Sequence, residues 1–145
     1  MTWTVRSPAT KNIIGTLDET SLEQVGEIYA NAKKAFLTWS DLSISERIHS
    51  LRKLRLHIIE ELNDIVKVIS DSTGKVAVES LTTEAMTVVD SISHIEKRAV
   101  AALKTRKIKT PIMFIGKSSY IEYKPRGTVL VISPWNFPFQ LSMIP

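Results

Sequence analysis

Apolar residues recur at every third or fourth position along three stretches of the chain, and this spacing predicts three amphipathic helical regions. The first runs from about residue 21 to residue 40, the second from residue 44 to residue 73, and the third from about Val78 to Leu103. Asn63 and Asp64 are the candidates to divide the second region into two helices. One face of the first region is predicted to be core and carries Leu22, Val25, Ile28, Tyr29, Ala32, Ala35, Phe36 and Trp39.

Short polar signals predict where these helices begin and end. Thr20 and Glu23 have the spacing of a capping box, in which each residue's side chain bonds the other's backbone amide. Ser43 and Glu46 repeat that spacing before the second region. Gly74 predicts the end of the second region, because glycine adopts the left-handed conformation of a helix C-terminus without strain.

The remaining segments predict strands. Residues 1–17 alternate in polarity around a Ser-Pro-Ala-Thr turn, and Ser119 to Tyr123 alternate in the same way. Thr128 to Ile132 form an uninterrupted apolar run, which is typical of a strand buried on both faces in a parallel sheet. A further helix is expected to begin near Phe139, directly after the loop that follows this run.

That loop, Ser133-Pro134-Trp135-Asn136-Phe137-Pro138, carries the strongest candidate for chemistry. In open α/β sheets, ligands lie just beyond the carboxyl ends of the strands. Pro134 and Pro138 stiffen the loop, because proline fixes φ and lacks a backbone donor. Asn136 could therefore donate a hydrogen bond to an oxygen on which negative charge develops. Alternatively, Asn136 caps a turn or a helix start, a common role for this side chain.

Composition and charge narrow the class of protein. The chain has 145 residues, 43% of them hydrophobic, which is enough for one folded domain with a core. The net charge is +4, and no acidic residue lies among positions 97 to 109. A basic helical domain that binds nucleic acid is the weakest alternative, because no aromatic residues are interleaved with these cations to stack on bases. The cations in question are Lys97, Arg98, Lys104, Arg106, Lys107 and Lys109.

Other polar residues have structural interpretations. His49, His57 and His94 lie on predicted helices without partners at ligand spacing, so no metal site is expected. Lys75 and Glu79 are four residues apart, which predicts a local ion pair. The chain has no cysteine, which excludes disulfides, and it shows neither a secretory leader nor an apolar run of membrane-spanning length. We therefore expect a cytoplasmic protein without membrane or nucleic-acid partners.

With these motifs in hand, the sequence resembles the amino-terminal part of the NAD(P)-dependent aldehyde dehydrogenase superfamily. Pro125-Arg126-Gly127 followed by the apolar run and Pro134 to Pro138 resembles the family's proline-glycine strand and its Pro-Trp-Asn-Phe-Pro signature. Weaker matches agree in order and spacing over the rest of the chain: Ser7 to Thr10, Ile14-Gly15, Ala32, Ala35-Phe36, Trp39, Arg47, Leu51, Leu54, Thr73 to Lys75 and Glu79.

The resemblance implies an α/β fold, the helix-rich amino-terminal part of a Rossmann-like cofactor-binding domain with its first buried parallel strand. It divides the chain into a helical part at 1–115, a strand of an oligomerisation arm around Tyr120 at 116–125, and the strand and signature loop at 126–145. It also implies NAD or NADP as cofactor, an aldehyde as substrate and a homo-oligomer as the assembly.

The resemblance assigns roles to the loop residues. Asn136 matches the amide that donates to the oxyanion of a cysteine thiohemiacetal. Ile132, Ser133, Pro134 and Trp135 match the lining of the adenosine-ribose slot, although Ile132 and Trp135 could simply be core. The family's nucleophilic cysteine and general-base glutamate lie beyond position 145, so the chain alone is expected to be inactive. The alternative is a non-catalytic module that pairs with full-length subunits.

Overall fold

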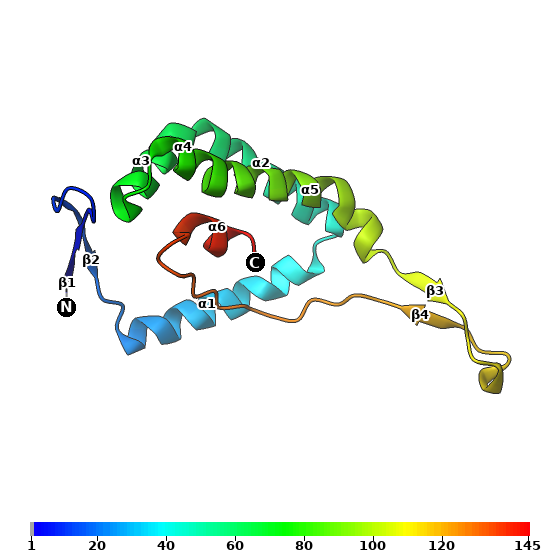
Figure 1. Ribbon diagram of the computed structural model, residues 1–145. Helices are drawn as coiled ribbons and strands as arrows, with labels where there is room; N and C mark the ends of the chain where they lie inside the picture. Colours follow the sequence, from blue (N-terminus) through cyan, green and yellow to red (C-terminus); the bar gives the residue numbers. More distant parts are fainter. Residues whose placement is uncertain (1) are drawn as a thin grey trace.

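The computed structural model describes residues 2–145 and shows the helices of residues 44–103 packed together, with the helix of residues 22–41 lying apart from them and a hairpin on either side (Figure 1). The chain enters through one hairpin, builds the helices, leaves through a second hairpin and returns to the helices at its carboxyl end. The helices are α1 (Leu22–Asp41), α2 (Ile44–Glu60), α3 (Leu62–Thr73), α4 (Ala77–Glu79), the π-helix η1 (Ser80–Ala85), α5 (Met86–Leu103), the 3₁₀ turn η2 (Ile112–Phe114) and α6 (Pro138–Met143).

The helix starts follow local capping chemistry. At α2, the prediction is confirmed: the Ser43 hydroxyl accepts from the Glu46 amide at 3.2 Å, and the Glu46 carboxylate accepts from the Ser43 amide at 2.8 Å. At α1, the prediction of Thr20 and Glu23 is wrong by one residue. Ser21 and Gln24 form the box instead. Glutamine serves at this position as well as glutamate does, so two overlapping signals were present in the sequence.

The ends of α2 and α3 were also encoded locally. The predicted break falls at Glu61, two residues before Asn63. Gly74 ends α3 with φ of 80°, the left-handed conformation expected of it. A side chain at this position would also be crowded, because an ideal Cβ on Gly74 lies 3.2 Å from Cγ of Pro8. The turn of the amino-terminal hairpin therefore packs against the end of α3.

The third helical region is continuous from α4 to α5, but it is not a uniform α-helix. Residues 80–85 have the wider π-helical turn η1. This turn buries Ser80, Glu84 and Ala85, none of which is exposed to solvent. The helical spacing of this region did not indicate such a turn. Turns of this type inside α-helices are often found at functional sites.

The two hairpins agree with the predicted strands. β1 (Thr2–Arg6) pairs antiparallel with β2 (Ile13–Asp18), with an irregularity between Val5 and Arg6. β4 (Ser119–Ile121) covers the first part of the predicted strand and pairs antiparallel with β3 (Arg106–Ile108). β3 lies inside the basic segment and was missed, because its alternation is only three residues long. Figure 1 shows the β3–β4 hairpin extending well away from the helices.

The predicted buried strand at Thr128–Ile132 is wrong for this structure. The segment forms no strand, and Val129, Leu130 and Ile132 are each about 80% exposed. It runs beside α1, where Gly127 and Thr128 line a shallow hollow with residues of that helix. A parallel strand needs neighbouring strands for its hydrogen bonds, and residues 2–145 form only two separate antiparallel pairs.

The hydrophobic core lies between α2 and α5 and excludes α1. Ile58, Val88 and Ile92 form its centre. α1 contains no fully buried residue, and its predicted core face is mostly exposed, with Leu22 and Ile28 at 92% and 61%. Tyr29, predicted to be core with Phe36 and Trp39, is also exposed, whereas Phe36 is only partly buried. A periodic apolar face shows that a helix is suited to burial. Whether the helix is buried depends on a neighbouring segment that covers that face.

We expect Gly74→Ala to lower the free energy of unfolding by about 1–2 kcal/mol, because alanine is strained at positive φ. Crowding against Pro8 adds to that cost. The control is Gly26→Ala in α1, where a Cβ meets nothing within 4 Å and should stabilise the helix by about 0.5–1 kcal/mol. Urea titrations of both variants measure the difference. Equal effects would contradict a specific role for the left-handed turn.

The α2–α5 interface predicts acid sensitivity. Glu96 accepts from Nε and Nη2 of Arg55 at 2.6 and 3.2 Å, and this hydrogen bonding lowers the pKa of Glu96 against the opposing effect of burial. A carboxylate with a lowered folded-state pKa stabilises the fold above its unfolded-state pKa, and loses that contribution as pH falls through the folded value. Stability should therefore decrease as pH falls below about 4.5, the ordinary value for glutamate, and continue to decrease through the lowered folded-state pKa of Glu96.

Glu96→Gln should remove part of this pH dependence, measured as urea midpoints across the acid range. Ser43 lowers the pKa of Glu46 through the capping box, so Glu46→Gln should remove a separate part. The two carboxylates share no partner, and the double variant should show both losses. An unchanged acid profile in Glu96→Gln would contradict the assignment.

Candidate functional site

The signature loop forms a turn at Trp135 and Asn136 immediately before α6. Asn136 is exposed, and its carboxamide makes no hydrogen bond within the described part of the chain. Pro138 occupies the first turn of α6, where its missing N–H leaves nothing unsatisfied. The helix predicted near Phe139 is thus confirmed, and Asn136 is presented on a turn directly ahead of it.

The residues expected to line a cofactor slot lie on the solvent side of this loop. Ile132 and Trp135 are 85% and 86% exposed, so the alternative that they are simply core is wrong within residues 2–145. Pro134 is exposed as well. The Ser133 hydroxyl lies 2.7 Å from the hydroxyl of Ser142, which itself donates to the carbonyl of Pro138. This hydroxyl pair ties the start of the loop to α6.

A fully buried carboxylate, for which the sequence predicted no role, holds the other side of α6. Glu84 comes from the π-helical turn η1 and has no exposed surface. Its Oε2 accepts from the amides of Phe139 and Gln140 at 2.9 and 3.4 Å. These amides belong to the first turn of α6, where backbone N–H groups lack partners within the helix. Glu84 therefore caps a helix that begins more than fifty residues later in the chain.

Lys75 neutralises this buried carboxylate. Its Nζ lies 2.5 Å from Oε1 of Glu84 and 3.7 Å from the ring centre of Phe137. The predicted pair between Lys75 and Glu79 is wrong, because Glu79 is exposed and Lys75 points inward to Glu84 instead. A buried charge requires a partner of opposite sign, whereas a surface carboxylate is adequately solvated by water. Lys75 and Glu84 together hold the residues on the carboxyl side of Asn136.

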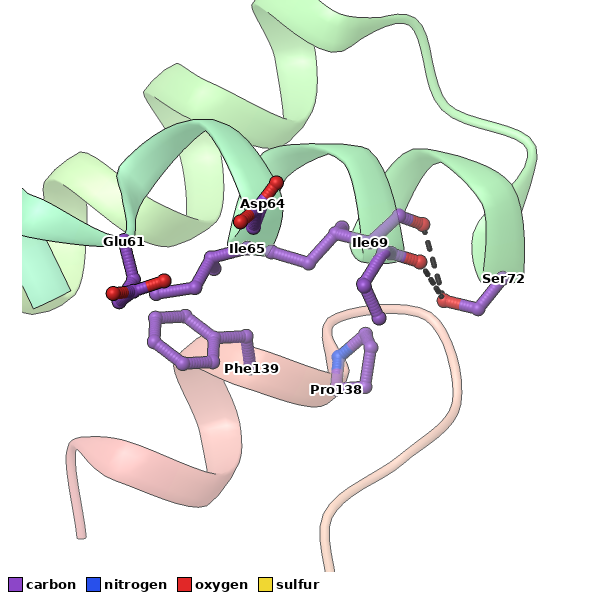
Figure 2. A pocket seen from close by; sticks show the side chains of 8 residues that line it. Glu61, Asp64, Ile65, Ile69, Ser72, Pro138 and Phe139 are labelled. Atoms are coloured by element: carbon purple, nitrogen blue, oxygen red, sulfur yellow. Dashed lines mark hydrogen bonds between the residues drawn. The ribbon is translucent and has the colours of Figure 1, made fainter. Parts of the chain in front are cut away.

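Apolar contacts complete the attachment of α6. Phe139 and Met143 pack against the central core cluster. Figure 2 shows Pro138 and Phe139 facing Ile65 and Ile69 of α3 across a hollow of about 460 Å³. Ser72 at one end of this hollow donates to carbonyls of its own helix, and Glu61 and Asp64 lie at the rim. The hollow is lined mainly by apolar side chains, so it extends the packing surface and supplies no reactive group.

The arrangement gives Asn136 a defined position and an unoccupied amide. Everything after it is anchored by Glu84, Lys75 and the core, while its own carboxamide remains available to donate to a ligand. The sequence contained a signal for this anchor, since Glu84 lies three residues after Leu81 and four before Val88, on the apolar face of a predicted helix. In the structure Glu84 lies in the π-helical turn η1, and its carboxylate contacts Lys75.

Two further findings concern the residues that the structure describes. His49, His57 and His94 are exposed on helices, and no group of three or more potential metal-ligating side chains occurs among residues 2–145. Over the same residues, the helices are too short or too polar for any of them to cross a membrane.

Comparison with known proteins identifies the family. The model of the aldehyde dehydrogenase family matches residues 1–145. The chain is 34% identical over 140 residues to a 4,4'-diapolycopene aldehyde oxidase of a Methylomonas species, which covers 96% of this chain and 26% of that protein. It is 35% identical over 117 residues to the 4,4'-diaponeurosporen-aldehyde dehydrogenase of Staphylococcus aureus, covering 81% of this chain and 26% of the relative.

A solved structure shows the same fold. The NADP-dependent glyceraldehyde-3-phosphate dehydrogenase of Bacillus halodurans, crystallised with NADP, superimposes with a TM-score of 0.87 at 27% identity, over 99% of this chain and 30% of that one. The chain belongs to the aldehyde dehydrogenase family and has the helix-rich α/β structure of the family's amino-terminal region. It spans about a quarter of the length of the curated relatives it matches.

We expect Glu84→Gln to loosen α6 and to lower the free energy of unfolding by about 3–5 kcal/mol, because it leaves Lys75 buried without its counter-charge. Hydrogen exchange at the amides of Phe139 and Gln140 should become faster, since the neutral oxygen of glutamine is a weaker acceptor for both than the Glu84 carboxylate. Glu79→Gln is the matched control on the neighbouring turn and should change neither quantity. Protection that persists at both amides, together with an unchanged free energy of unfolding in Glu84→Gln, would show that the carboxylate does not hold the loop.

Proposed function

We propose that this chain supplies the oxyanion-binding amide of an NAD(P)-dependent aldehyde dehydrogenase, with Asn136 as the donor. The observation that supports this role is the unoccupied carboxamide of Asn136, exposed on a turn whose next residues are anchored by Glu84 and Lys75. A rigidly held donor stabilises developing charge without reorganising during the reaction. A merely structural asparagine would spend its amide on capping the turn.

The proposed reaction needs one group from this chain and other groups from outside it. A thiolate adds to the aldehyde carbon, and the carbonyl oxygen becomes an oxyanion to which Asn136 donates a hydrogen bond. NAD or NADP, when bound, would supply the hydride acceptor for this carbon, and water would then hydrolyse the resulting thioester to the carboxylic acid and the free thiol. The chain has no cysteine, so the thiol has to come from residues outside these 145. By itself the chain is therefore predicted to oxidise no aldehyde.

The cofactor contribution proposed for this chain is one wall of the adenosine-ribose slot, formed by Ile132, Ser133, Pro134 and Trp135. The exposed side chains of Ile132 and Trp135 support it, because cofactor pockets consist mostly of apolar walls with few polar contacts. Neighbouring strands would convert residues 128–132 into the first parallel strand of the Rossmann-like domain, for which these residues have the required apolar faces.

The assembly proposed is a homo-oligomer that uses the strand at residues 116–125. β4 occupies one side of a two-stranded pair, so its other edge has free backbone groups that can extend a sheet of a second subunit. The alternative function, a non-catalytic module that pairs with full-length subunits, uses the same edge. The two are distinguished by whether Asn136 affects turnover, because a pairing module has no need of its amide.

The test is a chimera in which this chain replaces the matching amino-terminal quarter of the Methylomonas 4,4'-diapolycopene aldehyde oxidase. We expect aldehyde-dependent reduction of NAD or NADP, and Asn136→Ala should lower kcat by about 100- to 1,000-fold. Asn31→Ala on the exposed side of α1 is the control and should leave kcat unchanged. The isolated 145-residue chain should show no turnover in the same assay.

Several results would contradict the proposal. Hydride transfer by the isolated chain would remove the need for an external thiol. Unchanged turnover in Asn136→Ala would exclude the oxyanion role and favour the pairing module. If the chimera does not fold, as judged by circular dichroism, the Staphylococcus relative provides a second host. The aldehydes named for the two relatives are the first substrates to compare.

A further inference from the structure

The β3–β4 hairpin carries four consecutive apolar residues at its far end. Residues 112–115, called here the arm tip, are Ile-Met-Phe-Ile and include the turn η2. Ile112, Met113 and Ile115 are between 86% and 88% exposed, and Phe114 is 59% exposed. Figure 1 shows this turn at the end of the hairpin, remote from the helical layer. The proposed oxidation chemistry gives these side chains no task.

The charged residues around the arm tip are all positive. Residues 97–121 contain seven lysines and arginines and no aspartate or glutamate. Arg106 and Lys107 lie on β3, Lys109 follows this strand, and Lys117 lies just before β4. All four are exposed. The arm thus combines a strongly apolar end with a cationic collar immediately behind it.

We propose that the arm tip inserts into the surface of an anionic lipid bilayer. Peripheral segments of this kind bury apolar side chains about 5–10 Å into the boundary between headgroups and acyl chains, while flanking lysines and arginines bind the negative headgroups. Ile112 to Ile115 supply the inserted side chains, and the exposed Tyr120 ring on β4 lies where interfacial aromatics are favoured. The expected absence of a membrane partner was based on the absence of an apolar run long enough to span a bilayer. Peripheral insertion of a hairpin tip needs no such run.

Charge and polarity together favour lipid over the other occupants. A second copy meeting this one tip to tip would bring two cationic collars together, which repel each other. A nucleic acid would attract the cations, but it takes up apolar side chains as wedges between base steps and offers no continuous apolar medium for four consecutive ones. An anionic bilayer satisfies both parts of the surface at once. Pairing of subunits through the free edge of β4 would use backbone groups, whereas the arm tip offers apolar side chains.

The experiment is co-sedimentation of the purified 145-residue chain with vesicles. Vesicles of phosphatidylcholine mixed with phosphatidylglycerol should bind the chain at least tenfold more tightly than vesicles of phosphatidylcholine alone. Added salt should weaken this binding, because exposed charges are screened. Met113→Asp/Ile115→Asp should reduce it by about tenfold or more, since two inserted side chains are lost. Lys107→Glu/Lys109→Glu should reduce it by a similar factor.

Matched variants control for general stickiness and for net charge. Leu22→Asp/Leu37→Asp removes two exposed apolar side chains from α1, and Lys34→Glu/Lys53→Glu reverses two exposed cations on α1 and α2. Both should bind mixed vesicles like the unmodified chain. If the control pairs lower binding as much as the arm variants do, or if both vesicle types bind equally, the proposal is overturned.

Sedimentation velocity without vesicles distinguishes the protein partner. If the chain self-associates, binds no vesicles and becomes monomeric only in Met113→Asp/Ile115→Asp, then the arm tip is a contact between copies and the lipid proposal fails. Loss of vesicle binding in the arm variants with unchanged sedimentation supports the proposal. Asn136→Ala should leave vesicle binding intact, so failure of the proposed chemistry and failure of this inference give different results.

Discussion

A carboxylate completely removed from water controls how this chain closes on itself. Burying an ionised group costs several kcal/mol unless opposite charge and hydrogen-bond donors surround it. Glu84 has both, with Lys75 on one oxygen and two amides of α6 on the other. This need is directional, so it fixes where the carboxyl-terminal turn lies against the helices. Apolar contact of Phe139 with the core could not select one orientation by itself.

The loop is therefore constrained on one side and open on the other. Towards the helices, Phe137 and α6 are held by charge and packing. Towards solvent, Ile132, Trp135 and the amide of Asn136 have no counterpart within residues 2–145. A catalytic group benefits from this asymmetry, because its support has to be rigid while its reactive end stays free. The packed helices therefore have a core of their own, whereas the signature loop at residues 133–138 lies at a surface that no described residue covers.

The projecting hairpin follows a different principle. Its strands satisfy their backbone groups in pairs, and its side chains are left to the surroundings. In a segment of this kind the sequence is not constrained by packing within the chain. Seven cations with no acidic residue among them, close to four exposed apolar residues, therefore carry information about the kind of surface that the arm binds. In this hairpin the backbone pairing determines the fold, whereas the exposed side chains determine what the surface can bind.

Much of the fold could be predicted from sequence alone, because short-range physics determines it. Helical spacing, the capping box of Ser43, the left-handed turn at Gly74 and the start of α6 depend on neighbours within a few residues. The resemblance carried by residues 125–138 correctly indicated the family. Only the tertiary structure determined which segments and side chains contact one another. It left α1 and the run at 128–132 exposed, paired Lys75 with Glu84 instead of Glu79, and used a π-helical turn to bury that carboxylate. Periodicity records that a side chain is suited to burial, whereas long-range packing determines which surface covers it.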